Sequence, residues 1–296
     1  MLSWLDQIAR FQPLFEQLVV IFSLVLTRVS GLMLAAPIFG ARETPMRVRA
    51  LLAFSIALLV LPTQLAMVID RPSDLATLVL SPDQNMGAID WGTDSGRPEN
   101  LVNYLIVVVN ETTIGLALGM AVMLLFVGVQ AVGQVVSQMS GMAMANSFDP
   151  TLQTQVPVLS QLLRLLALAI FVIAGGHRLL MKALLDTFQV IPLGGPGIGA
   201  SLSDSLITVL TQAFTFGIRA AAPVIMSLLL SVLVLGLIGR TLPQLNILAI
   251  GFGINSMVML MTVSLSIGTF GWLFHEQIQL AIDTVTQGIY EAAADI

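Results

Sequence analysis

Long stretches without charge dominate this chain and set its predicted secondary structure. Five intervals contain no Asp, Glu, Lys or Arg, namely residues 50–69, 112–148, 187–203, 220–239 and 241–275. Two further apolar stretches, residues 18–39 and 157–176, contain one arginine each. A helix needs about 20 mostly apolar residues, each rising about 1.5 Å, to cross the hydrocarbon core of a bilayer. The pattern therefore predicts an all-α, polytopic membrane protein.

About six long hydrophobic helices are expected, with cores at residues 18–40, 50–69, 101–133, 157–177, 205–238 and 245–273. Ahead of the first core, Trp4, Ile8, Phe11 and Phe15 share one helical face. This face fits either an interfacial lead-in or the first turns of the same helix. Because no basic region precedes the apolar run, we expect no cleaved signal peptide.

Composition agrees with the pattern and removes several classes of function. Of the 296 residues, 56% are hydrophobic and 10% are charged, and the net charge is −5. An acidic chain without clusters of Lys and Arg lacks the basic surface that binds nucleic-acid phosphates, which excludes nucleic-acid binding. With no cysteine it has neither a disulfide framework nor a thiol nucleophile. We expect one helical subunit over residues 1–296, with no cofactor and no metal.

The charged connections indicate an orientation. Residues 41–49 hold three arginines against one glutamate, whereas residues 70–100 hold six acids against two arginines. Positive loops stay in the cytoplasm, so residues 70–100 are expected to form an acidic periplasmic loop. Arg178 and Lys182 do not fit the positive-inside rule, because six membrane spans would place them on the periplasmic side.

Catalytic chemistry needs titratable groups that converge, and no HExxH, GxSxG or paired-carboxylate spacing occurs. The sequence therefore predicts a protein that is not an enzyme. Charges inside the apolar helices cost about 2.5–3.5 kcal/mol each at a helix centre, so each should find a partner or water. We expect these charges to be paired for structural reasons. The alternative is that they couple transport to the movement of a proton or an ion. These charges are Arg28, Glu111, Arg164 and Arg219.

Small residues mark the third apolar stretch. Gly115 and Gly119 form a GxxxG motif, and further Gly, Ala and Ser follow up to Ser147. Small residues let helix backbones approach closely in a membrane. The chain should have tight helix neighbours, either its own helices or those of other subunits.

A methionine-rich block follows at residues 134–157, and it breaks at Phe148, Asp149 and Pro150. Methionine side chains adapt to irregular space. The block is either a deformable constriction that seals around variable cargo or an ordinary Met-rich helix end. Its candidate sealing residues are Met139, Gly141, Met142, Met144, Phe148, Asp149 and Pro150.

Four motifs carry a resemblance to a known family. They are RVSGLMLAAPIFGARETPMRVRALLAF, GQVVSQMSGMAMANSFDP, VPVLSQLLRLLALAIFVIAGGHRLL and GRTLPQLNILAIGF. Together they resemble the FliR family of flagellar biosynthesis proteins, from about residue 18 to residue 274 and in the same order. The corresponding component of virulence type III secretion systems is similar.

The resemblance implies a subunit of the protein export gate in the bacterial inner membrane, at the flagellar basal body. The implied partners are P-type and Q-type subunits (FliP, FliQ), the B-type gate subunit (FlhB), unfolded export substrates and membrane lipid. The helices would form hairpins in a helical assembly, and residues 205–275 would form a C-terminal hairpin similar to a Q subunit. Residues 134–157 would hold the central loop that helps to plug the closed pore.

Two loops are candidates for assembly contacts under this resemblance. The first holds Arg42, Arg47 and Arg49, for which a positive-inside anchor is the favoured interpretation and a partner contact the alternative. The second is the PQLN motif, with Pro243, Gln244 and Asn246, which is either a structural turn or an assembly contact. The chain departs from the family after IGF, where Gly253, Ile254 and Asn255 replace an expected proline and basic residue.

Two other functions stay open. Six apolar helices with glycine breaks also fit a secondary transporter of a small solute, which would depend on Glu111. The chain could also be a scaffold that supports the gate without lining its pore. Substitutions in the methionine-rich block, from Met139 to Asp149, would then cause no ion leak.

Overall fold

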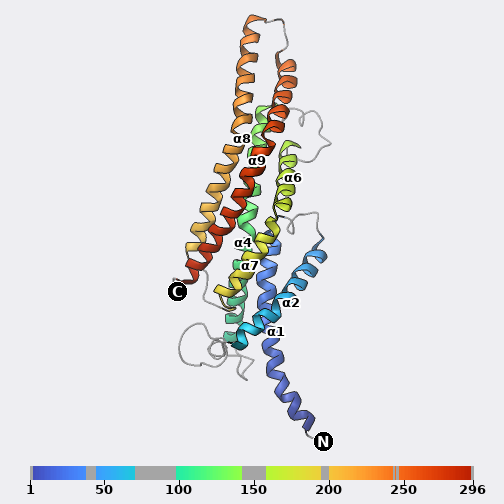
Figure 1. Ribbon diagram of the computed structural model, residues 1–296, viewed down its shortest axis with the longest axis vertical. Coiled ribbons are helices and arrows are strands. Elements are labelled where there is room, and N and C mark those ends of the chain that lie inside the picture. Colours follow the sequence, from blue (N-terminus) through green and yellow to red (C-terminus); the bar gives the residue numbers. More distant parts are fainter. Residues whose placement is uncertain are drawn as a thin grey trace. The chain divides into compact units, whose positions relative to one another are not determined.

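The computed structural model describes residues 3–37, 45–70, 98–141, 158–194, 200–242, 244 and 247–294. All regular structure in these ranges is α-helical. The helices are α1 (Ser3–Ala35), α2 (Met46–Asp70), α4 (Pro98–Met139), α6 (Val158–Ile173), α7 (Gly176–Val190), α8 (Ala200–Thr241) and α9 (Ile247–Ala294) (Figure 1). Five of them are long and apolar enough to cross a membrane, and the bent pair α6–α7 adds a sixth. The expected all-α, polytopic class is confirmed.

The chain divides into two compact units. Unit 1 comprises Met1–Ala121, Leu180–Leu206 and Ile282–Ile296, and unit 2 comprises Val122–Leu179 and Ile207–Ala281. The helices α4, α7, α8 and α9 each contribute residues to both units. The expected interval 245–273 is only part of α9, which continues to Ala294.

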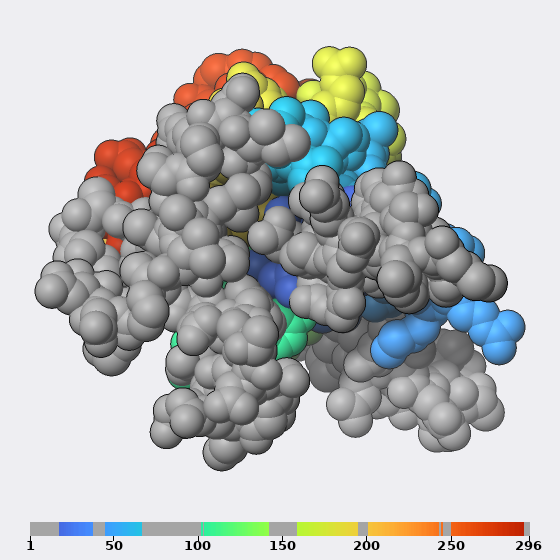
Figure 2. Space-filling view, turned by 90° about the horizontal axis from the view of Figure 1, so that it is seen from below, coloured from blue at the N-terminus to red at the C-terminus, as the bar shows by residue number. Residues whose placement is uncertain are grey.

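In unit 1, α1 and α2 form a hairpin of adjacent helices (Figure 1). Ala53, Ala57 and Val60 of α2 are buried, and they follow the i, i+4, i+7 spacing of one helical face. The ring of Phe54 meets that of Phe22 edge to face at 5.3 Å. The outer face of α2 stays exposed and apolar, for example at Leu59, and its light-blue side chains lie at the surface in Figure 2.

The helices α1 and α4 cross at their glycines. A Cβ atom at Gly115 would overlap the backbone carbonyl oxygen of Arg28, and one at Gly119 would lie 2.7 Å from the Cβ atom of Ala35. A Cβ atom at Gly31 would likewise overlap the carbonyl oxygen of Thr112. The predicted GxxxG approach is thus satisfied by the chain's own first helix.

In unit 2, parts of α4, α6, α8 and α9 surround a core of aromatic and aliphatic side chains. The Phe126 ring packs edge to face against Phe171 at 6.0 Å and Phe274 at 5.6 Å. A second cluster joins Val136, Leu159, Leu228 and Met259 from the same four helices. Such interlocked packing holds each helix against its neighbours.

The apolar interval 157–177 is not one helix, and that expectation is wrong. The helix α6 ends at Ile173, Gly175 takes a left-handed φ of 72°, and α7 starts at Gly176 after a bend of 63°. Gly176 accommodates the Phe171 ring, which a Cβ atom there would overlap. Two consecutive glycines supply both the positive φ and the space that the bend needs.

Beyond the bend, α7 is amphipathic. Leu180, Ala183 and Leu184 are buried, whereas Arg178 and Lys182 are exposed on another face. The two basic residues that disagreed with the simple topology thus lie on the polar face of a separate helix.

Candidate functional site

The best-defined polar centre of the described residues lies in unit 1, between α1 and α4. Arg28 Nε donates to Glu111 Oε2 at 2.5 Å, and the two side chains are 0% and 3% exposed. The glycine crossing of α1 and α4 brings these residues together from positions 83 apart in sequence. A buried ion pair with such geometry satisfies two charges that would each be costly alone.

Each partner of the pair also holds the turn that follows α7. Glu111 Oε1 accepts the backbone N–H of Gly194 at 3.0 Å, and Gly194 has a φ of 77°. Arg28 Nη1 and Nη2 both donate to the carbonyl oxygen of Ile191 at 3.4 Å. The guanidinium carbon lies 4.4 Å from the centre of the Phe188 ring, a cation–π distance. The pair therefore joins α1 and α4 to the end of α7.

Sequence reasoning identified Arg28 and Glu111 and expected structural pairing, which the structure confirms. It missed Ile191 and Phe188, because a backbone carbonyl and a ring carry no sequence signal for a charge partner. Gly194 begins a glycine- and proline-rich stretch, residues 194–199, and such a stretch is a sequence signal for a turn but not for a carboxylate partner.

The other two charges differ from this pair. Arg164 on α6 is half-buried and engaged in an interaction. Arg219 on α8 is exposed, and it finds no hydrogen-bond or ion-pair partner in the described part of the chain. The expected structural pairing is thus not seen for Arg219 among the described residues.

The methionine-rich block, residues 134–157, overlaps the C-terminal end of α4, so its first residues are helical rather than part of a loop. Met139 is the last residue of α4 and packs, half-buried, against the Val136 and Leu159 cluster. Gly141 has a φ of 79°, and its N–H donates to the carbonyl of Gln138, so it closes the helix. Met142, Met144, Phe148, Asp149 and Pro150 lie outside the described residues. Sealing by this block stays a prediction.

The two predicted contact loops are only partly described. Arg47 is exposed at the start of α2, and Arg49 is half-buried and engaged in an interaction. Gln244 is exposed between α8 and α9. Arg42, Pro243 and Asn246 lie outside the described residues, as do residues 71–97 of the acidic loop.

Side-chain hydrogen bonds fix the register of α8 against α9 in unit 2. Ser231 Oγ donates to Asn255 Oδ1 at 2.6 Å, and Thr262 Oγ1 donates to Ser227 Oγ at 3.0 Å. Asn255 stands where the family resemblance implied a basic neighbourhood, and here it serves this hydrogen bond. The two bonds hold α8 and α9 side by side over residues 227–231 and 255–262, and the C-terminal hairpin over residues 205–275 stays a prediction.

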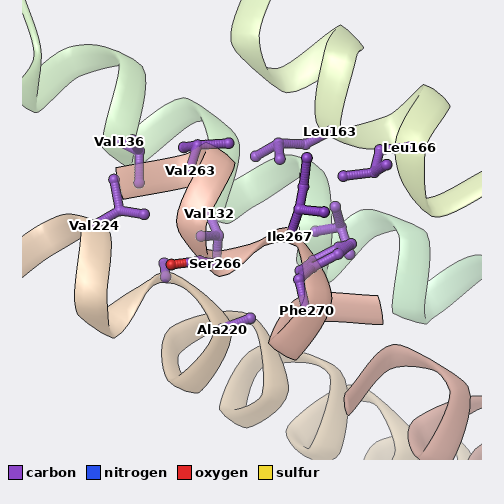
Figure 3. A pocket seen from close by; sticks show the side chains of 13 residues that line it. Val132, Val136, Leu163, Leu166, Ala220, Val224, Val263, Ser266, Ile267 and Phe270 are labelled. Carbon is purple, nitrogen blue, oxygen red and sulfur yellow. The ribbon is translucent and has the colours of Figure 1, made fainter. Parts of the chain in front are cut away.

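A cavity of about 40 Å³ lies among the four helices of unit 2. Figure 3 shows that the side chains around it are aliphatic or aromatic, with Ser266 as a polar exception. A space of this size holds about one water molecule. It offers neither the volume nor the polar groups that a solute-binding site needs.

The described residues contain no group of three or more His, Asp or Glu side chains that could hold a metal ion. Long apolar helices, glycine crossings and an internally paired charge define a polytopic helical membrane protein. The chain matches the family model described as bacterial export proteins, family 1, over residues 19–281, and it belongs to that family. The predicted resemblance to FliR proteins is confirmed.

Three relatives are called flagellar biosynthetic protein FliR. The protein from Escherichia coli (strain K12) is 30% identical over 269 residues, covering 88% of this chain and 91% of the relative. The one from Bacillus subtilis (strain 168) is 27% identical, covering 89% and 92%. The one from Pectobacterium carotovorum is 28% identical, covering 88% and 90%. The chain is thus a membrane component of flagellar biosynthesis and export.

Proposed function

We propose that this chain is the R-type subunit of the flagellar-type export gate in the bacterial inner membrane. Together with P-type and Q-type subunits it forms and seals the pore through which unfolded substrates leave. Membership of the bacterial export family over residues 19–281 carries this proposal. The role is steric rather than enzymatic.

The interior of unit 2 supports a pore formed between subunits rather than inside one chain. Its cavity of about 40 Å³ is far smaller than an extended polypeptide, and the surrounding helices interlock. Exposed apolar side chains cover much of α8 and α9, including Leu233, Met257 and Leu265. An apolar surface of this extent indicates contact with lipid or with neighbouring subunits.

We assign sealing to the methionine-rich block, residues 134–157, from Met139 onward. The packed side chain of Met139 and the left-handed Gly141 give this block a fixed starting point at the end of α4. Methionine and phenylalanine side chains would close against ions and move aside for a chain, because they are soft and uncharged.

Co-purification tests the assembly. The tagged full-length chain, expressed with intact P-type, Q-type and B-type subunits and extracted in mild detergent, should bring the P-type and Q-type subunits with it. Recovery of the chain without them would contradict the proposal. It would favour a transporter, whose solute uptake should then be lost in Glu111→Gln.

Ion leak tests the seal. Phe148→Ala in the assembled gate should raise ion permeability of the membrane, whereas Phe214→Ala, a change of an exposed phenylalanine on α8, should not. Equal permeability of the Phe148→Ala gate and the unchanged gate would remove Phe148 from the seal. It would favour a supporting scaffold.

A further inference from the structure

Four exposed polar side chains follow one face of α8 within unit 2. They are Thr208, Thr211, Thr215 and Arg219. Their spacing of three or four residues keeps them on one side of the helix, along a ridge that rises about 16 Å. Thr211 and Thr215 donate their hydroxyl protons to carbonyl oxygens of α8 itself. Each hydroxyl oxygen can still accept a hydrogen bond from outside the helix.

A ridge of large apolar side chains runs directly beside the polar one. Ile207, Leu210 and Ile218 are 61%, 36% and 62% exposed, and each immediately precedes a residue of the polar ridge. These three side chains and the four polar ones together form what we call the mixed face of α8. Further along the helix the polar ridge stops, because the positions that continue it are apolar. Those positions are Ala222, Met226, Leu229 and Leu233.

Arg219 ends the polar ridge and lacks a counter-charge in the described part of the chain. Its guanidinium group forms neither a hydrogen bond nor an ion pair with any residue that the structure describes. An arginine on an apolar helix needs an acceptor, because an uncompensated cation is costly there. The surface that covers the mixed face must therefore offer an acceptor at the level of Arg219.

Neither lipid nor water suits both ridges. Hydrocarbon would cover the isoleucines but leave Arg219 without an acceptor. A headgroup layer could pair with Arg219, but it is only about 5–8 Å thick on each side of the bilayer, which is about half the rise of the mixed face. Water would solvate Arg219 but leave the apolar ridge exposed. Exposed apolar patches rimmed by polar residues mark protein-binding surfaces.

Another α-helix suits both ridges. Spacings of three and four residues let the side chains of a second helix pack between those of α8. The threonine hydroxyls can form hydrogen bonds across such an interface, as they do between membrane helices. A second copy of this chain fits less well. In a parallel arrangement it would place Arg219 beside Arg219, and in an antiparallel one it would offer Asp204, which is already engaged in an interaction.

We propose that the mixed face of α8 binds an α-helix of a partner subunit and that an acidic side chain of that helix pairs with Arg219. The inference rests on the proposed function, because the partner must belong to the same gate. It accounts for a charge that finds no partner within the described chain. It also accounts for the end of the polar ridge at Arg219, where the contact with the acidic side chain is made.

Charge reversal tests the pair. Arg219→Glu should lower the recovery of at least one other gate subunit with the tagged full-length chain by about tenfold or more, because two like charges would meet in the interface. Arg219→Lys keeps the charge and should retain most of the recovery. Arg240→Glu is the matched control, since it reverses another exposed arginine of α8 beyond the mixed face. All three isolated chains should melt in detergent at the same temperature as the unchanged chain, because both arginines are exposed.

Photo-crosslinking tests the contact without changing Arg219. A photoreactive amino acid in place of Thr211 should capture a helix of one gate subunit in the assembled complex, and the captured peptide identifies that helix. Replacing its Asp and Glu residues by Lys, one at a time, should in one case restore the recovery of the Arg219→Glu chain. Equal recovery with Arg219→Glu and with the unchanged chain would overturn the inference. So would capture of lipid alone or of a second copy of this chain.

These outcomes differ from a failure of the proposed function. If the unchanged chain and Arg219→Glu both recover the P-type and Q-type subunits in full, the gate stands and the mixed face is not the contact. If the unchanged chain recovers neither subunit, the gate itself is refuted.

Discussion

Removing the carboxylate of Glu111 should strongly destabilise unit 1, because it leaves a buried charge without its counter-charge. The Arg28 side chain is fully buried, and Glu111 Oε2 is its carboxylate partner at 2.5 Å. Breaking a buried ion pair from one side costs about 3–5 kcal/mol. The backbone N–H of Gly194 loses its acceptor in the same step. The loss is large against a typical folding stability of about 5–15 kcal/mol.

Three further variants separate the effect of the lost charge from the effect of the lost hydrogen bonds. Glu111→Gln keeps an acceptor for Gly194 but removes the charge, so its loss should fall below that of Glu111→Ala. Arg28→Lys keeps the charge but cannot reach Glu111 and the Ile191 carbonyl with separate nitrogens. Replacing both partners, as Arg28→Met with Glu111→Leu, removes both charges and should recover part of the Glu111→Ala loss, although the Gly194 N–H and the Ile191 carbonyl still lose their partners at about 1–3 kcal/mol each.

Equilibrium unfolding of the purified chain in detergent, followed as a function of denaturant, measures these differences. Arg47→Ala is the control, since an exposed arginine should change stability by about 0.5 kcal/mol or less. The reasoning fails if Glu111→Ala costs less than about 1 kcal/mol. It also fails if the double variant is no more stable than Glu111→Ala, because the buried charge would then not be the cause.

Three further predictions concern glycines and the hairpin. Gly115→Ala should strongly reduce the stability of the chain in detergent, since its Cβ atom would meet the Arg28 carbonyl. Gly236→Ala has no atom within 4 Å of its Cβ position, so it should gain about 0.5–1 kcal/mol. Equal changes in melting temperature for the two variants would contradict the close crossing of α1 and α4. Gly175→Asn should be tolerated at its φ of 72° better than Gly175→Val, as judged by expression and melting temperature. Ser231→Ala should cost about 1 kcal/mol in unfolding experiments by leaving Asn255 without its donor; no measurable loss would show that this bond is dispensable.

The helices were predictable because charge is excluded from long apolar segments, a rule that needs no tertiary information. The break between α6 and α7 was not predicted, since glycines are common in membrane helices and do not by themselves end one. A usable signal was present after the break. Arg178, Lys182 and Asp186 recur every four residues, and Leu180, Leu184 and Phe188 occupy the opposite buried face. That pattern is typical of an amphipathic helix rather than of a loop.

The candidate site was predictable in its members but not in its connections. By composition Arg28 and Arg219 are equivalent, because each is a lone cation in an apolar helix. Only the fold distinguishes them: the α1–α4 crossing buries Arg28 beside Glu111, whereas α8 leaves Arg219 exposed.

The spacing of Gly115 and Gly119 predicts that another helix approaches closely, but it does not identify that helix. In this chain Gly115 and Gly119 both face α1, so the GxxxG motif is occupied within the subunit. It is therefore not available for contact with another subunit. Partners that bind this chain must use other surfaces, and the exposed apolar faces of α2, α8 and α9 are the candidates on the described residues. The outer face of α2 is one of these surfaces to test for subunit contacts, beginning with the exposed Leu51 and Leu59.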